Sequence, residues 1–201
     1  AVLQQLVQES YPLADFLRPS LVAPHVLKIR ERTKLEPLGR VQGVDLWLIA
    51  YGSLDHFRRQ PDQELVFKQR AGTQVHELTD AELAARQLSL RQSVDFEESW
   101  TYSSFEIFDR VQLSGTNHTV LTRSDESVVV AIETDGRFND DAQFANAWRS
   151  ILRSGAQDTA LGDPRPFQGF GSYLKVTRLH EPAGALLCEY HLIFLEPQAW
   201  F

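Results

Sequence analysis

The segment that decides the fold is residues 171–197, GSYLKVTRLHEPAGALLCEYHLIFLEP. Two runs of strand-forming residues, 173–180 and 185–196, flank the turn sequence Glu181-Pro182-Ala183-Gly184. Proline and glycine favour turns, whereas β-branched and aromatic residues favour strands, so this pattern predicts an antiparallel hairpin. In the second run one alternating set is apolar throughout: Leu186, Cys188, Tyr190, Leu192 and Phe194. One face of that strand should therefore be apolar.

The sequence before the hairpin has the same β character. Short runs rich in strand formers alternate with turn residues, which predicts an antiparallel meander. The predicted strands span residues 96–108, 110–114, 119–123 and 127–134, with turns at 115–117 and 124–126. Further strands are predicted at residues 26–35, 44–51 and 64–68.

A few segments favour helix. Residues 2–17 form an amphipathic pattern that Pro12 should kink or divide. Thr79 and Glu82 have capping-box spacing, which predicts a helix over 80–90. Two further helices are expected, at 54–59 and from Asp140 or Asp141 to residue 153. The sequence thus predicts one α+β domain over 1–201, a curved antiparallel sheet with a few covering helices.

Composition narrows the possible partners and the compartment. The net charge of −7 disfavours nucleic-acid binding, since an acidic protein repels phosphate. Cys188 is the single cysteine, so neither an intrachain disulfide nor a cysteine-based zinc site is expected. No apolar run is long enough to span a bilayer, and no integral membrane segment is expected. The absence of methionine slightly favours a processed, secreted or periplasmic protein over a cytoplasmic one.

Glu189 and His191 are the best candidates for polar chemistry. The sequence contains no P-loop, no dinucleotide fingerprint and no nucleophile elbow. Residues two apart share one face of a strand, and a turn centred on Pro182-Ala183 would place Arg178 diagonal to Glu189. This group could bind a polar head group, act as an acid–base pair, or be a solvated charge cluster. We expect no cofactor and no metal, although the acidic loop 135–141 is a weak calcium candidate.

Residues 96–201 resemble the START-like, helix-grip superfamily of lipid and polyketide binders. The resemblance rests on the meander 110–134, the segment around Trp148 and the hairpin that ends at Pro197. It implies a curved sheet that grips helices around an apolar cavity. In that superfamily a long C-terminal helix closes the cavity. Four residues follow Pro197 here, so that helix is either absent or left out of this sequence, and the N-terminal helix could substitute for it.

Three functions stay open. The first is non-enzymatic binding of an apolar or amphipathic, lipid-like small molecule between sheet and helices, with residues 154–171 as a lid. The second is a hydrolase or cyclase that uses Glu189 and His191. The third is an interaction module that docks an unknown protein partner through its sheet edge or aromatic surface. The predicted ligand-binding residues are Trp100, Tyr102, Trp148, Phe167, Arg178, Glu189, Tyr190 and His191.

Overall fold

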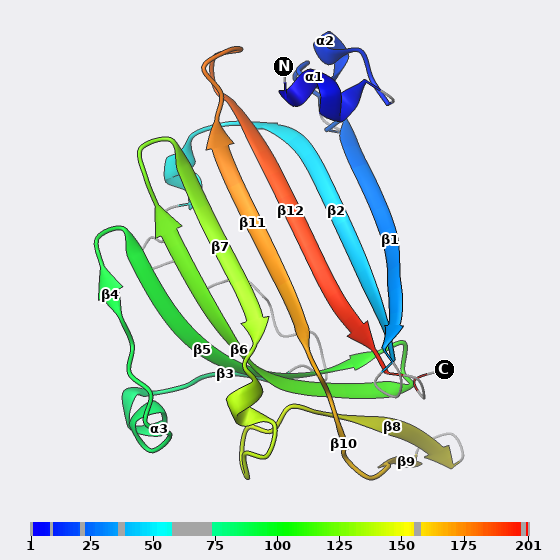
Figure 1. Ribbon diagram of the computed structural model, residues 1–201. Helices are drawn as coiled ribbons and strands as arrows, with labels where there is room; N and C mark the ends of the chain where they lie inside the picture. Colours follow the sequence, from blue (N-terminus) through cyan, green and yellow to red (C-terminus); the bar gives the residue numbers. More distant parts are fainter. Residues whose placement is uncertain are drawn as a thin grey trace.

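The computed structural model describes residues 2–8, 10–20, 23–35, 39–57, 74–154, 158–197 and 200. Its main feature is a twelve-stranded antiparallel sheet (Figure 1). The main path through the sheet runs β1-β2-β12-β11-β7-β6-β5-β3, and β4, β8, β9 and β10 pair beside it. The strands are β1 (His25–Leu35), β2 (Gly39–Tyr51), β3 (Gln74–Glu77), β4 (Gln92–Ser93), β5 (Phe96–Ile107), β6 (Val111–Arg123), β7 (Ser127–Thr134), β8 (Ala147–Ser154), β9 (Asp158–Leu161), β10 (Arg165–Pro166), β11 (Phe170–Arg178) and β12 (Ala185–Glu196).

Helix is scarce among the described residues. The α-helices are α1 (Val2–Val7), α2 (Leu13–Phe16) and α3 (Asp80–Ala84), and two short 3-10 turns are η1 (Leu54–Phe57) and η2 (Gly136–Phe138). The longest of these has six residues. The α+β, helix-grip-like fold predicted from the sequence is therefore wrong: the protein is mainly β. A coarser feature of the resemblance is confirmed: the protein has a large antiparallel sheet, with little helix.

Several local predictions are confirmed. Pro12 separates α1 from α2, as expected for a residue that cannot continue a helix. Thr79 and Glu82 form the capping box at the start of α3, although this helix ends at Ala84 rather than near residue 90. The hairpin forms as β11 and β12. The predicted strand over 64–68 lies outside the described residues.

The helix predicted up to residue 153 is wrong, because this segment forms β8. Asp141 Oδ1 accepts hydrogen bonds from the backbone N–H groups of Gln143 and Phe144, but the chain then extends rather than coils. β6 offers an open edge, and Trp148 pairs with Leu113 across it. Backbone pairing along this edge overrides the weak helical pattern, because buried N–H and C=O groups need partners.

The turn predicted at 115–117 is also wrong, since β6 passes through it without a break. Gly115 does not form a turn but leaves room for a neighbouring side chain. A Cβ at this position would lie 3.2 Å from Asn146 Oδ1, and that oxygen accepts a hydrogen bond from Thr116 N. The glycine thus permits close packing of the Asn146 side chain rather than chain reversal. The segment 154–171, expected as a lid, contains β9 and β10.

The sheet is bent, with the hairpin's apolar side on the inside. Figure 1 shows β5 and β6 bending across the lower end of the sheet. Phe105 of β5, Leu113 of β6 and Phe194 of β12 belong to one hydrophobic cluster. On a flat sheet, β5 would lie four strand spacings, about 19 Å, from β12, so the sheet must curl to bring these side chains together. We call this inner side the concave face and the other side the convex face.

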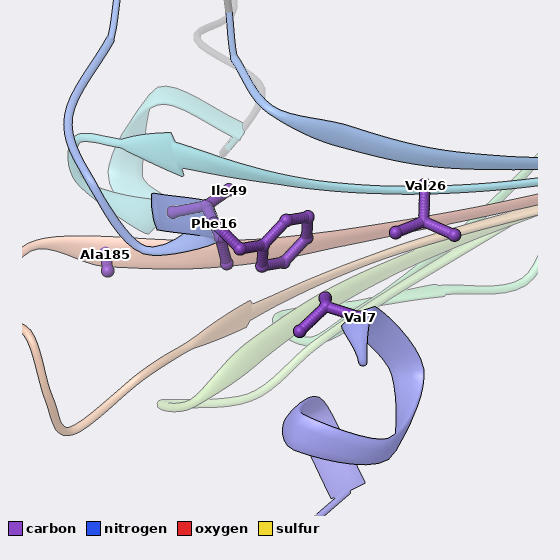
Figure 2. Close-up of a cluster of buried hydrophobic side chains, with 5 residues drawn as sticks. All are labelled: Val7, Phe16, Val26, Ile49 and Ala185. Carbon is purple, nitrogen blue, oxygen red and sulfur yellow. The ribbon is translucent and has the colours of Figure 1, made fainter. Parts of the chain in front are cut away.

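The helices pack on the convex face. Val7 of α1 and Phe16 of α2 pack against Val26, Ile49 and Ala185, as Figure 2 shows. At the opposite edge, Leu83 of α3 joins a second cluster that contains Trp100 and Phe144. The cavity expected between sheet and helices would need helices on the concave face. Among the described elements only η1 packs there, through Leu54 at one end.

Candidate functional site

The middle of the concave face is a continuous apolar surface. Strand register aligns one cross-strand row that is apolar over six strands: Leu27, Leu46, Tyr190, Leu174, Val130 and Leu121. The next row adds Ile29, Val44, Leu192 and Ile132, with Ser172 of β11 between the last two. Apart from Leu27 and Ile29, which are exposed on the edge strand, all of these residues are half-buried.

Both ends of this surface are closed by buried clusters. At one end Leu54 of η1 packs with Val128, Val176 and Leu186. At the other end the buried residues are Val111, Leu113, Trp148, Phe167 and Trp200. The apolar side chains are buried at the two ends of the face and half-buried between them, and we call this half-buried middle region the trough.

Towards β5 and β6 the trough becomes polar. Ser99 pairs with Thr119, and Thr101 pairs with Asn117, on the same face and in register with the apolar rows. Arg123 lies one row farther along β6, and its Nη1 is 2.9 Å from Glu97 Oε1. This side of the face therefore has hydroxyl and amide groups, and the positive and negative charges of its one described ion pair cancel.

The predicted aromatic residues fall into different places. Trp148 and Phe167 lie in the buried cluster that closes one end of the trough, where both pack with Trp200. Tyr190 lies in the middle of the trough and is half-buried. Trp100 and Tyr102 are on the convex face, in the cluster covered by α3. Of the five predicted lining aromatics, Tyr190 alone occupies the middle of the trough.

The predicted Arg178–Glu189–His191 group does not form. Arg178 pairs with Leu186 rather than Leu187, and Lys175 pairs with Glu189, so the register differs by one residue from the prediction. A shift of one residue moves a side chain to the other face of a sheet. Arg178 is therefore on the concave side, exposed at the hairpin end, whereas Glu189 and His191 are on the convex face.

His191 has a different acidic partner, which sequence reasoning missed. Its Nδ1 lies 2.8 Å from Oδ1 of Asp45 on the neighbouring β2, and Arg30 Nε lies 3.1 Å from the other Asp45 oxygen. The ring of Trp47 contacts the His191 ring edge-on, with the ring centres 5.3 Å apart. The pairing of β2 with β12 joins residues far apart in sequence, so no local pattern could have indicated it. Asp45 orients the imidazole on an open surface.

A second histidine–carboxylate pair lies on the convex face of β5 and β6. Glu98 is buried, accepts hydrogen bonds from Arg91, and lies 3.0 Å from His118 Nε2. The Arg91 guanidinium, helped by His118, holds the pKa of Glu98 at about 2, well below its usual range, against the opposing effect of burial. Trp100 stacks on His118 with the ring centres 4.3 Å apart.

The acidic loop 135–141 is held together by arginines. Burial alone would raise the pKa of Asp135, but hydrogen bonds from Arg137 and Trp100 outweigh burial and lower it. Asp141 accepts two hydrogen bonds from Arg86, and this guanidinium lowers the pKa of Asp141 strongly. Within the described residues, no three side chains of the metal-binding types gather at one place.

Neither the hollow beside the N-terminal helices nor the cysteine provides a better candidate site. A shallow hollow of about 440 Å³ lies at the turn between α1 and α2, and none of the predicted ligand-binding residues lines it. Cys188 lies on the concave face next to Val176, and burial raises the pKa of its thiol, which disfavours the reactive thiolate.

Comparison with known proteins gives no assignment. No protein-family model matches the chain, and a search of curated proteins finds no similar sequence. None of the helices in the described part of the chain has the length and apolar character needed to cross a bilayer.

Proposed function

We propose that the protein binds an apolar or amphipathic small molecule in the concave trough, without catalysing a reaction. The observation that supports this proposal is the apolar row across β1, β2, β12, β11, β7 and β6, which stays only half-buried between two buried ends. A contiguous apolar surface of this kind usually marks a binding site. Covering about 300 Å² of it would contribute about 7 kcal/mol before the entropic cost of association.

The polar side of the trough favours an amphipathic ligand over a plain hydrocarbon. Ser99, Thr119 and Asn117 can exchange hydrogen bonds with hydroxyl or ester groups. Because Arg123 is already paired with Glu97, this region offers little excess charge for a free carboxylate or phosphate. A neutral head group, such as the glycerol of a monoacylglycerol, matches it best, with the acyl chain lying across β7 to β1.

A matched pair of substitutions tests this role. Val130→Thr makes the trough polar at constant side-chain volume, whereas Val129→Thr makes the same change on the convex face of the same strand. Titration with a fluorescent monoacylglycerol should show that Val130→Thr weakens binding about fivefold, since an unpaired hydroxyl costs about 1 kcal/mol. Val129→Thr should leave binding unchanged. Equal affinities for the two variants, or no uptake by the wild-type protein, would reject the proposal.

A hydrolytic role is the second candidate, favoured by the hydrogen bond between Asp45 and His191. An acid that orients a histidine is a common part of general-base catalysis. The pair lies on the convex face, and neither residue lines the hollow between α1 and α2. If His191 is catalytic, the purified protein should hydrolyse a p-nitrophenyl ester with a bell-shaped pH–rate profile that His191→Ala abolishes. A profile that the substitution leaves intact would exclude this role.

A further inference from the structure

The outer edge of β1 has backbone groups and a basic face that ligand binding in the trough does not use. β1 extends from His25 to Leu35, and among the described strands it pairs with β2 alone. An edge strand leaves alternate N–H and C=O groups without a strand partner and can accept an added strand. Leu27 is 50% and Ile29 is 70% exposed, which is unusual for apolar side chains on a long edge strand.

The charge of β1 is opposite to that of the whole protein. The strand contains four basic residues and one acidic residue, whereas the chain has a net charge of −7. Lys28 and Arg30 share the convex face of β1, and Leu27 and Ile29 share its concave face. The edge therefore offers a basic side and an apolar side along the same backbone.

We infer that this edge binds an extended acidic segment of a partner protein, which joins the sheet as an additional strand beside β1. Residues paired across two strands lie on the same face. A partner strand with alternating acidic and apolar residues would thus place one carboxylate near Lys28 and the next near Arg30, which already pairs with Asp45. Its apolar side chains would lie against Leu27 and Ile29. Charge complementarity would set the orientation, and main-chain hydrogen bonds would supply affinity.

A second copy of this chain fits the same edge less well. In a two-fold antiparallel pairing each face continues from one copy into the other, so even-numbered residues of β1 meet even-numbered ones. The basic residues Lys28 and Arg30 both have even numbers. Like charges directly opposite each other destabilise a sheet.

Binding of a fluorescein-labelled peptide of alternating glutamate and valine, followed by anisotropy, tests the inference. We expect binding that weakens with added salt and falls about tenfold in Lys28→Glu. The matched control is Lys175→Glu, on the convex face of the interior strand β11, which should bind normally. A peptide of the same sequence with alternate backbone nitrogens methylated should not bind, because it cannot complete the strand pairing.

Four outcomes would overturn the inference: no binding of the alternating peptide, equal binding of the methylated peptide, equal loss of binding in both lysine variants, or a wild-type dimer in sedimentation that Lys28→Glu alters. The last result would assign the edge to a second copy. Circular dichroism verifies that each variant is folded. Monoacylglycerol uptake by Lys28→Glu should equal that of the wild type, so the two proposals can fail separately.

Discussion

The concave and convex faces of the sheet are built from the same strands but differ in what covers them. On the convex face, α1 and α2 pack over Ile49 and Ala185, and α3 packs over Trp100. Two carboxylates on the strands of this face, Glu98 and Asp45, pair with His118 and His191. On the concave face the buried residues gather at the two ends, and the apolar middle stays half-buried. Alternation along each strand gives both faces apolar side chains. The position of the helices decides on which face these side chains stay partly exposed.

The largest expected effect of a substitution is at an end of the concave face. Trp148→Ala removes a buried aromatic ring from the cluster with Phe167 and Trp200, and it should lower the free energy of unfolding by about 3–5 kcal/mol. Arg149→Ala, the next residue on the same strand but on the other face, should cost less than about 1 kcal/mol. Urea denaturation gives both values. Similar losses in the two variants would mean that this end is not a core.

A smaller effect is expected on the convex face, from Glu98. Its lowered pKa means that the ionised carboxylate stabilises the fold above the ordinary glutamate pKa, and that this contribution disappears as the pH falls towards about 2. Glu98→Gln should therefore cost about 2 kcal/mol at pH 7, and the difference from wild type should shrink between pH 5 and pH 2. Thermal unfolding across this range measures it, with Glu106→Gln on the same strand as the control. A difference that does not vary with pH would contradict the assigned ion pair.

The smallest effect should come from the middle of the trough. Leu192→Ala should cost about 1 kcal/mol, because the side chain is already partly in contact with water. Leu186→Ala, on the same face of the same strand but fully buried at one end, should cost about 3 kcal/mol. Urea denaturation of the two variants compares the middle with the end directly. Equal costs would show that the trough is packed as tightly as its ends and would remove the basis for ligand binding.

Sequence patterns predicted which residues form strands more reliably than they predicted which strands lie next to each other. The alternation in residues 173–196 correctly indicated β11 and β12, and the capping box correctly marked the start of α3. Residues 147–153 were predicted as part of a helix because Phe144, Trp148, Ile151 and Leu152 have helical spacing. Their strand conformation depends on the free edge of β6, which a local pattern cannot reveal. β3, which pairs with β5, was missed for the same reason.

At the candidate site, too, local strand features were predicted and contacts between distant strands were not. Tyr190 was correctly placed on an apolar strand face, yet its neighbours Leu46 and Leu174 follow from strand order and register. One residue of register separated Arg178 from Glu189 and His191 and placed them on opposite faces. The resemblance to a helix-grip fold failed because the described helices cover the convex face.

By itself the sequence determined which residues alternate, where most turns fall, and that one side of the last strand is apolar, because these properties depend on neighbours within a few positions. Tertiary structure alone decided that this side is concave, that Asp45 holds His191, and that the basic strand β1 lies at an edge. These features depend on pairing between strands distant in the chain, and the energy of such pairing is set by backbone hydrogen bonds and burial rather than by local sequence.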